Sequence, residues 1–280
     1  MSAPYNLPSL KHFHYTEFAS LYEPAEDTYL LCDSLSQDLF EEQKEGSGSC
    51  NSLSPPPPPP PPPPSLVIEI GSGSGAVASH VNNLLSARGE PRPVTLCIDI
   101  SPIACTASLR TATANDKSSS AFAVDAVCSD LLGSLLPRIH GSVDLLIFNP
   151  PYVPTPDDEV LSQSRALSLA QEMSSKSGLG NSSTYITNVD SFIKNEPEAQ
   201  FLIASWAGGD RGRRVLDRAM PQIAACLARP HGRAYIVLVE DNDPMQFGEE
   251  ADLLYGLKMR TVLRTKAKNE NLQVVVLSFE

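Results

Sequence analysis

The 280-residue sequence predicts an α/β fold in which a mostly parallel, Rossmann-like sheet of seven strands ends in an antiparallel hairpin. Short apolar runs alternate with helical segments, which is typical of a doubly wound parallel sheet. A glycine-rich turn follows the first run, and open α/β sheets bind ligands at such turns. The link 265–271 between the last two runs is too short for a parallel crossover, so these runs should pair as a hairpin.

The individual elements are expected from hydrophobic periodicity. The strands are the runs 66–70, 94–98, 121–127, 143–148, 234–239, 259–264 and 272–279. Helical spacing of apolar residues predicts helices over 75–87, 102–114, 212–228 and 244–257. A further helix is expected within 22–40, where Pro24 and several acidic residues precede leucines at helical spacing.

Two segments interrupt this alternation. Residues 44–65 contain ten consecutive prolines, which would form a polyproline II rod of roughly 30 Å. We interpret this segment as a tolerated surface insertion, and a docking site for an SH3- or profilin-like partner is the alternative. Residues 157–200 are rich in Ser, Asn and charge, so we expect a flexible insertion, with a lid over the substrate entrance as the alternative. The remaining parts are an N-terminal helical segment (1–43), a ligand-binding half (66–156) and a C-terminal half (201–280).

The chain carries a net charge of −12, with 33 acidic against 21 basic residues. This acidic balance argues against a nucleic-acid partner and is compatible with a cationic ligand. Residues 1–18 carry charges and histidines without the apolar core of a signal peptide, and no run reaches the roughly eighteen apolar residues of a membrane span. We therefore expect a soluble protein of the cytoplasm, with the nucleus as a second compartment.

Six cysteines occur at positions 32, 50, 97, 105, 128 and 226. They form no C-x-x-C pair and no paired Cys/His spacing, so the pattern predicts buried thiols. We expect neither a disulfide framework nor a metal site.

A glycine loop, Gly71-Ser72-Gly73-Ser74-Gly75, follows the strand 66–70 directly and precedes a helix. Glycine lets a ligand approach the backbone, so this placement predicts a ligand site, although glycine triplets also occur in flexible linkers. Asp99 ends the second strand, where a carboxylate can accept hydrogen bonds from ribose hydroxyls or can be an ordinary strand-end polar residue. Asp130 and Leu131 follow the third strand, where a carboxylate or a neighbouring amide could bind the amino group of an adenine.

Asn149-Pro150-Pro151-Tyr152 follows the apolar run 143–148. Two prolines end the strand and lack N–H donors while keeping their carbonyls, and the residue before a proline is held in an extended conformation. The corner therefore presents rigid hydrogen-bond acceptors beside an aromatic ring, which suits a planar NH2 group. Tyr152 can alternatively be a core aromatic. A nicotinamide cofactor would use a similar glycine frame, but no Tyr-x-x-x-Lys pair accompanies it.

Several segments together carry a resemblance to a known family. They are Tyr22-Glu23-Pro24-Ala25-Glu26-Asp27-Thr28, Glu69-Ile70-Gly71-Ser72-Gly73-Ser74-Gly75, Asp99-Ile100-Ser101-Pro102, Ser129-Asp130-Leu131-Leu132, Asn149-Pro150-Pro151-Tyr152-Val153 and Trp206-Ala207-Gly208-Gly209, with Gly212, Arg213, Val215, Asp217 and Arg218. The chain resembles class I S-adenosylmethionine-dependent methyltransferases. More narrowly, it is similar to the eukaryotic and archaeal HemK-like branch, which methylates the glutamine of the Gly-Gly-Gln loop in translation release factors. The proline tract, the insertion ending near Gln200 and Asp210-Arg211 depart from the family pattern.

The resemblance implies S-adenosylmethionine as the cofactor, a release factor as the protein substrate, and a small zinc-binding activator as the partner in a heterodimer. It makes 66–156 the cofactor-binding half of a methyltransferase domain. Carried over by position, the cofactor contacts are Thr28, Glu69, Gly71, Gly73, Asp99, Asp130, Leu131 and Asn149. The substrate contacts are Asn149, Pro150, Pro151, Tyr152 and Val153, of which Asn149, Pro150 and Tyr152 would be catalytic.

Three other functions stay open. A DNA or RNA adenine N6-methyltransferase also presents a planar amino group to such a corner, but it needs a basic channel, which the net charge of −12 disfavours. A protein lysine methyltransferase is a second alternative, and a non-catalytic scaffold acting through the proline tract is a third. Trp206-Ala207-Gly208-Gly209 is either a turn packed on the core or part of the substrate mouth.

Overall fold

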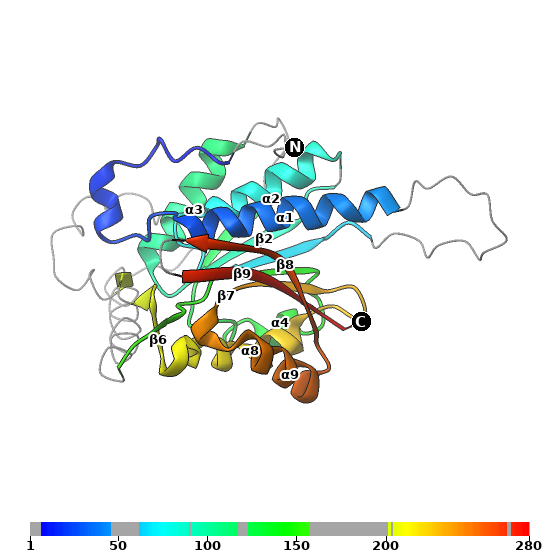
Figure 1. The fold of residues 1–280 in the computed structure, drawn as a ribbon. Helices are drawn as coiled ribbons and strands as arrows, with labels where there is room; N and C mark the ends of the chain where they lie inside the picture. The colour runs from blue at the N-terminus through cyan, green and yellow to red at the C-terminus, as the bar shows by residue number, and fades with distance from the viewer. Residues whose placement is uncertain are drawn as a thin grey trace.

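Seven strands form one sheet in the computed structural model, in the order β3-β2-β1-β4-β7-β9-β8 (Figure 1). The structure describes residues 7–45, 62–89, 91–116, 123–156, 201–202, 204–267 and 270–279. The strands of this sheet are β1 (Leu66–Ile70), β2 (Val94–Asp99), β3 (Val124–Cys128), β4 (Leu145–Phe148), β7 (Arg233–Val239), β8 (Lys258–Ala267) and β9 (Glu270–Ser278). The fold class predicted from the sequence is confirmed.

The strand order places two loops side by side. The strands β3, β2, β1, β4 and β7 run parallel, whereas β9 pairs antiparallel with both β7 and β8. The order reverses between β1 and β4, which are neighbours with Ile70 opposite Phe148. Doubly wound sheets bind ligands outside the carboxyl ends of their strands at such a switch point. The glycine loop and the Asn-Pro-Pro-Tyr corner both leave the sheet there.

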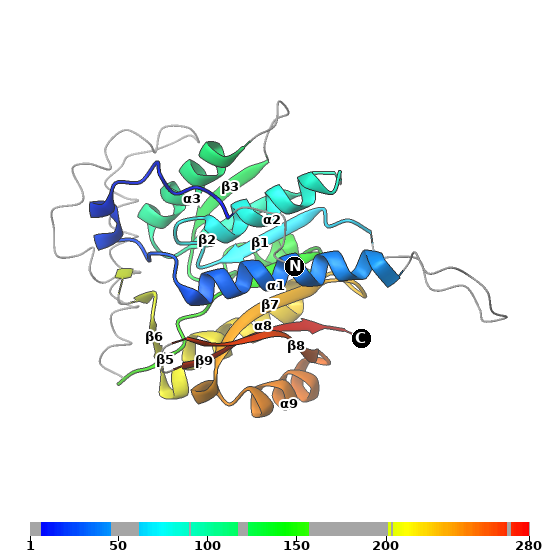
Figure 2. The same cartoon turned by 45° about the horizontal axis from the view of Figure 1, so that its top comes forward.

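Helices cover both faces of the sheet (Figures 1 and 2). One face carries α1 (Glu26–Glu45), α2 (Ala76–Ala87) and α3 (Pro102–Asn115), and the other carries α4 (Leu136–Ile139), α8 (Arg214–Cys226) and α9 (Pro244–Tyr255). Both faces of β4 and β7 are buried, which explains why these strands are continuous apolar runs. Short 3-10 turns are η1 (Tyr15–Ala19), η2 (Asp210–Gly212) and η3 (Glu240–Asn242).

The observed elements differ from the expected ones mainly at their ends. β4 begins at Leu145 rather than at 143, because Val143 forms an isolated bridge with Leu227 instead of pairing with β1. α8 begins at Arg214 rather than at 212, because Arg211 and Gly212 have positive φ angles that a helix cannot contain. The strand expected from 121 begins at 124, and the helix expected to end at 40 continues to 45.

A second, two-stranded sheet was not expected from the sequence. It pairs β5 (Val153–Pro154) with β6 (Ala207–Gly209). Strands of two and three residues are too short to show a period of two, so no pattern indicates them. The interpretations of the proline tract and of 157–200 concern residues 46–61 and 157–200, which lie outside the described residues.

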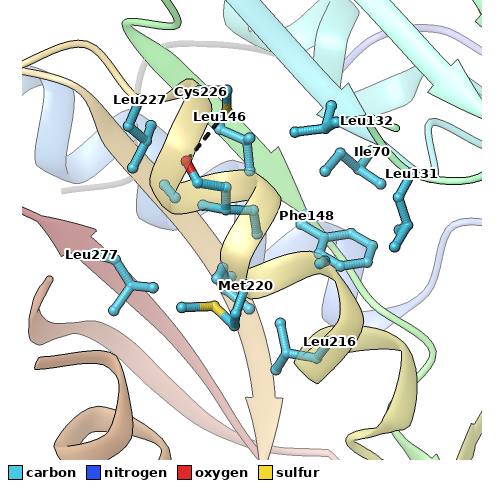
Figure 3. Packing of buried hydrophobic residues seen from close by; sticks show 14 of the residues in the cluster. Ile70, Leu131, Leu132, Leu146, Phe148, Leu216, Met220, Cys226, Leu227 and Leu277 are labelled. Carbon is cyan, nitrogen blue, oxygen red and sulfur yellow. Dashed lines mark hydrogen bonds between the residues drawn. The ribbon is translucent and has the colours of Figure 1, made fainter. Parts of the chain in front are cut away.

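The end of β4 is anchored in the core against α8. Phe148 is only 2% exposed and belongs to one cluster with Ile70, Leu131 and Leu216, which surround it in Figure 3. Because Phe148 directly precedes Asn149, this packing fixes the place at which the polar corner leaves the sheet.

Within the described ranges, no helix is long and apolar enough to cross a membrane. The described cysteines are free thiols, namely Cys32, Cys97, Cys105, Cys128 and Cys226. In the same part of the chain, no three His, Cys, Asp or Glu side chains are grouped so that they could hold a metal ion.

Candidate active site

A cavity of about 280 Å³ opens at the carboxyl ends of the parallel strands. A second cavity, of about 10 Å³, has room for one water molecule at most, so the first is the candidate site for an organic ligand. Every residue predicted from the sequence as a cofactor or substrate contact lines the first cavity. These residues are Thr28, Glu69, Gly71, Gly73, Asp99, Asp130, Leu131, Asn149, Pro150, Pro151, Tyr152 and Val153.

The three glycines of the loop have different surroundings. Gly71 and Gly73 line the cavity with positive φ angles of 66° and 50°. A Cβ atom on Gly73 would meet nothing within 4 Å, so open space lies beside its backbone. At Gly75, in contrast, a Cβ would lie 2.5 Å from Cα of Ser108 in α3. Gly73 therefore leaves room for a ligand beside its backbone, and Gly75 allows α2 to pack against α3.

Asp99 is held by the backbone on two sides. Its Oδ2 atom accepts a hydrogen bond from the N–H of Gly73 (2.9 Å), and Oδ1 accepts one from the N–H of Ser101 (2.8 Å). Burial raises the pKa of Asp99, and these N–H groups oppose the shift. A carboxylate oxygen can accept more than one hydrogen bond, so Asp99 can still bind a donor such as a ribose hydroxyl.

Glu69 is a second acidic group in the cavity wall, only 4% exposed. Its Oε2 atom accepts a hydrogen bond from the N–H of Ala78 (2.9 Å). Burial raises the pKa of Glu69 to about 8, the N–H of Ala78 lowers it, and the negative charge of Asp99 raises it further. A cationic ligand in the cavity would favour the ionised form of Glu69.

The loop after β3 contains an ion pair and a strained residue. Asp130 lines the cavity, and the guanidinium of Arg218 in α8 binds its carboxylate. Leu131 has a φ of 53°, which is unusual for a residue other than glycine, while its side chain is buried in the core. The carboxylate of Asp130 is shared with Arg218, so a ligand here would meet the backbone of this loop as well as the carboxylate.

Asn149 is hydrogen-bonded to Asp27, which the sequence did not indicate as a site residue. Nδ2 of Asn149 lies 2.9 Å from Oδ2 of Asp27, although 122 positions separate the two residues. The same oxygen accepts hydrogen bonds from the hydroxyls of Tyr22 (2.9 Å) and Tyr152 (3.2 Å). Asp27 lies in the first turn of α1, inside the motif 22–28, and this position next to Thr28 is the signal that could have indicated it.

The other end of the Asn149 amide has no partner. Its Oδ1 atom is buried, yet it accepts no hydrogen bond from any residue that the structure describes. Burying an unpaired acceptor costs about 1–3 kcal/mol, and Asn149 is a lining residue of the cavity, so Oδ1 is a candidate acceptor for a ligand that donates a hydrogen bond.

Tyr152 both packs on the core and lines the cavity. Its ring packs against the core cluster between the sheet and the helices α1 and α2, and its hydroxyl reaches Asp27 at the cavity. Burial and the negative charge of Asp27 raise the pKa of Tyr152 and also that of Tyr22. Both hydroxyls therefore keep their protons and act as donors to the carboxylate.

The segment 206–209 supports the Asn-Pro-Pro-Tyr corner. The N–H of Val153 donates a hydrogen bond to the carbonyl of Trp206 (3.1 Å), next to the pairing of β5 with β6. Asn242, which the sequence did not indicate, donates from Nδ2 to the carbonyl of Tyr152 (3.1 Å). Trp206 also lines the cavity, so this segment is both a packed turn and part of the cavity wall.

No protein-family model matches the chain. It is 32% identical to mouse methyltransferase HEMK2 over 271 residues, which cover 97% of this chain and 95% of the mouse protein. It is 31% identical over 274 residues to the eRF1 methyltransferase catalytic subunit mtq2 of Schizosaccharomyces pombe, with 96% and 93% covered. Among solved structures, the Mtq2–Trm112 complex of E. cuniculi matches with a TM-score of 0.48 and 20% identity, covering 93% of this chain and 99% of that one.

The human methyltransferase HEMK2 is 31% identical over 258 residues, covering 92% of this chain and 89% of the human protein. Identity above 30% along nearly the whole length of these relatives, together with the class of fold and the cavity described above, indicates common descent. The chain belongs to the HEMK2 family of methyltransferases.

Proposed function

We propose that this methyltransferase transfers a methyl group from S-adenosylmethionine to the side-chain amide of the glutamine in the Gly-Gly-Gln motif of a translation release factor. The observation that carries the proposal is the buried, unpaired acceptor Oδ1 of Asn149, a residue that lines the cavity. A primary amide presents N–H donors, so a site that holds its nitrogen needs acceptors. The yeast relative that matches 96% of this chain is named an eRF1 methyltransferase catalytic subunit, which supports a release factor as the substrate.

The cavity fits S-adenosylmethionine as the cofactor. Open space lies beside the backbone of Gly73, and Asp99 offers acceptors for ribose hydroxyls. The acidic side chain of Glu69 favours a ligand that carries positive charge. When bound, the cofactor would supply an electrophilic methyl group on a sulfonium. The residues that would hold it are Thr28, Glu69, Gly71, Gly73, Asp99, Asp130, Leu131 and Asn149.

The polar corner would bind and orient the acceptor amide. Amide conjugation, whose scale is set by a rotation barrier of ~18–20 kcal/mol, makes this nitrogen a poor nucleophile. Oδ1 of Asn149 and the carbonyl of Pro150 would accept its two N–H groups and stabilise the positive charge that develops on nitrogen. One such preorganised group typically contributes about 3–4 kcal/mol. Correct placement of the reacting groups contributes roughly 7–11 kcal/mol in well-oriented intramolecular reactions.

Pro151, Tyr152 and Val153 would form the wall against which the substrate side chain lies. Pro150 and Pro151 are buried, and because a proline follows both Asn149 and Pro150, the backbone angles that set the directions of these two carbonyls are restricted. The Tyr152 ring is held through its hydroxyl on Asp27, so it can lie against a planar amide and exclude water.

A second subunit is part of the proposal. The yeast relative is named a catalytic subunit, which supports a partner for this chain, and the motif resemblance implies a small zinc-binding activator. The site of action would be the cytoplasm, where translation terminates. Expression of the chain alone should give insoluble or inactive protein that co-expression with the activator rescues.

The test is to incubate the purified chain and its activator with labelled cofactor and a release factor, and to map the label by mass spectrometry. We expect label on the glutamine of Gly-Gly-Gln and none on a release factor in which alanine replaces that glutamine. Label on a lysine, or on an adenine of an added oligonucleotide, would instead assign one of the alternatives and contradict the proposal.

A further inference from the structure

Asp27 is a buried carboxylate that connects the first turn of α1 to the Asn-Pro-Pro-Tyr corner. It is only 2% exposed. Its Oδ2 atom accepts hydrogen bonds from Asn149, Tyr22 and Tyr152. Its Oδ1 atom accepts from the N–H of Thr28 (2.6 Å) and from the hydroxyl of Thr28 (3.2 Å). All of these contacts use the carboxylate as an acceptor.

The surroundings of Asp27 differ from those of Asp38, a buried aspartate on the same helix. Asp38 accepts a hydrogen bond from the hydroxyl of Tyr235 (2.6 Å) and forms an ion pair with Arg260 (2.8 Å). Among the ion pairs of the described residues, none involves Asp27. The donors to Asp27 all belong to residues that line the cavity, whereas Asp38 does not line it.

The contact with Asp27 determines which end of the Asn149 amide has no hydrogen-bond partner. Asp27 accepts every hydrogen bond that it forms, so the NH2 end of Asn149 must face it. The oxygen is then the free end, and it is the buried atom without a partner. With the amide reversed, its oxygen would face the carboxylate, and the free end would be an NH2 group. That group would repel the N–H donors of an amide substrate.

We propose that Asp27 is a positioning residue that fixes the orientation of the Asn149 amide and thereby selects a methyl acceptor whose planar NH2 group donates its protons. The inference rests on the proposed function, because it takes the unpaired Oδ1 atom of Asn149 as the acceptor of a hydrogen bond from the substrate. It adds a residue of α1 to the determinants of substrate class.

The substitution Asp27→Asn makes the two ends of this side chain different, because one end stays an oxygen acceptor and the other becomes an NH2 donor. The backbone N–H of Thr28 can only donate, and it lies 2.6 Å away, so the oxygen of the new amide must stay on that side. Its NH2 group then faces Asn149, which can satisfy it only by turning its own oxygen towards position 27. The hydroxyls of Tyr22 and Tyr152 do not oppose this, because a hydroxyl can also accept.

We expect Asp27→Asn to lower kcat by about a hundredfold, the loss typical of one misdirected preorganised group. The cofactor affinity measured by calorimetry should change much less than kcat, because only one of the eight residues proposed to hold the cofactor is turned. Asp38→Asn is the matched control, since it alters a buried aspartate of the same helix outside the cavity. It should lower Tm while leaving kcat unchanged. An Asp27→Asn variant that behaves like this control would overturn the proposal.

The double substitution Asp27→Asn with Asn149→Asp tests the orientation directly. A carboxylate at position 149 accepts hydrogen bonds at both ends, so it can bind the amide at position 27 and still offer an oxygen to the substrate. Asn149→Asp alone would place two carboxylates in contact and should also lose turnover. We expect the double variant to be at least about tenfold more active than either single variant, which is a difference of about 1.4 kcal/mol in activation free energy from each of them. Additive losses would contradict the proposal.

A readout without cofactor or substrate separates this inference from the proposed function. In the ¹⁵N spectrum of the labelled chain co-expressed with its activator, Asp27→Asn should shift the side-chain NH2 resonance of Asn149, identified by its loss in Asn149→Ala. An unmoved resonance would overturn the inference. If the resonance moves but the wild-type protein labels no release factor, the proposed function fails and the role of Asp27 stands.

Discussion

Gly212 approaches the carbonyl oxygen of Tyr152 so closely that a Cβ atom at position 212 would lie 1.9 Å from that oxygen. Gly208 makes a similar approach, because its Cβ would lie 2.7 Å from the carbonyl oxygen of Pro151. The segment before α8 therefore fits against the Asn-Pro-Pro-Tyr corner without space for a side chain. These two glycines are required by the shape of the corner, whereas Gly73 borders open space.

Gly212→Ala should displace the corner and lower kcat with a release factor by about a hundredfold, since misplacement by about 1 Å can have that effect. Gly89→Ala is the matched control, because Gly89 has a similar φ of 72° but nothing within 4 Å of an added Cβ. Both variants bear the same backbone strain, and only the first should lose turnover in steady-state assays. Equal turnover in the two variants would show that the corner tolerates displacement.

Asn149→Ala should lower kcat by about a hundredfold, because it removes the unpaired acceptor of a residue that lines the cavity. The cofactor affinity should fall much less than kcat, since Asn149 is one of eight residues proposed to hold the cofactor, and no hydrogen bond described above joins its side chain to the glycine loop or to Asp99. Steady-state kinetics and calorimetry measure the two quantities separately. A parallel loss of turnover and cofactor affinity would refute the role proposed for Asn149.

Asp99→Ala should weaken cofactor binding first. It removes acceptors for the ribose and also releases the N–H of Gly73. Hydrogen bonds to charged groups contribute about 1.5–3 kcal/mol, so calorimetry should show an affinity about tenfold to a hundredfold lower. The exposed Asp241 offers a control of equal charge change, and Asp241→Ala should bind the cofactor as the wild type does.

The stability of the cofactor-free protein should fall as the pH rises from about 4.5 to about 8, because burial raises the pKa of Glu69 to about 8. Over this range the unfolded chain loses the proton of Glu69 before the folded protein does. The contribution of Glu69 to the free energy of unfolding is fully present below its ordinary pKa and is lost as the pH rises through the raised pKa. Each unit by which the pKa is raised corresponds to about 1.4 kcal/mol of this contribution.

Urea unfolding at a series of pH values measures this effect. Glu69→Gln resembles the protonated acid, so it should flatten the profile and leave only the slope of other groups, among them Asp99. A profile as steep as that of the wild type would show that Glu69 does not titrate in this range.

The sheet and the segments of the site were predictable because their signals are local. The continuous apolar run of β4 indicates a strand buried on both faces, and two prolines mark its end. The predicted contact residues line one cavity because the carboxyl ends of parallel strands meet at one edge of a sheet. Their individual roles stay predictions.

The contacts between distant segments were not predictable. The bonds of Asp27 to Asn149 and of Asn242 to Tyr152 join side chains and backbone across the fold, and no periodicity in the sequence encodes them. The pairing of Asp130 with Arg218 is of the same kind. Such contacts depend on how α1, η3 and α8 pack around the strand ends, which only the folded chain determines.

The two ends of α1 differ in their distance from the candidate active site. Asp27 lies at the cavity in the first turn of this helix, and the helix ends at Glu45, about 27 Å from Asp27 along the axis at 1.5 Å per residue. The proline tract is joined to that remote end and to the amino end of β1, whereas 157–200 starts directly after β5 at the corner. A fluorophore or purification tag inserted into the tract should therefore leave methyltransferase activity unchanged. The same insertion after β5 should abolish that activity.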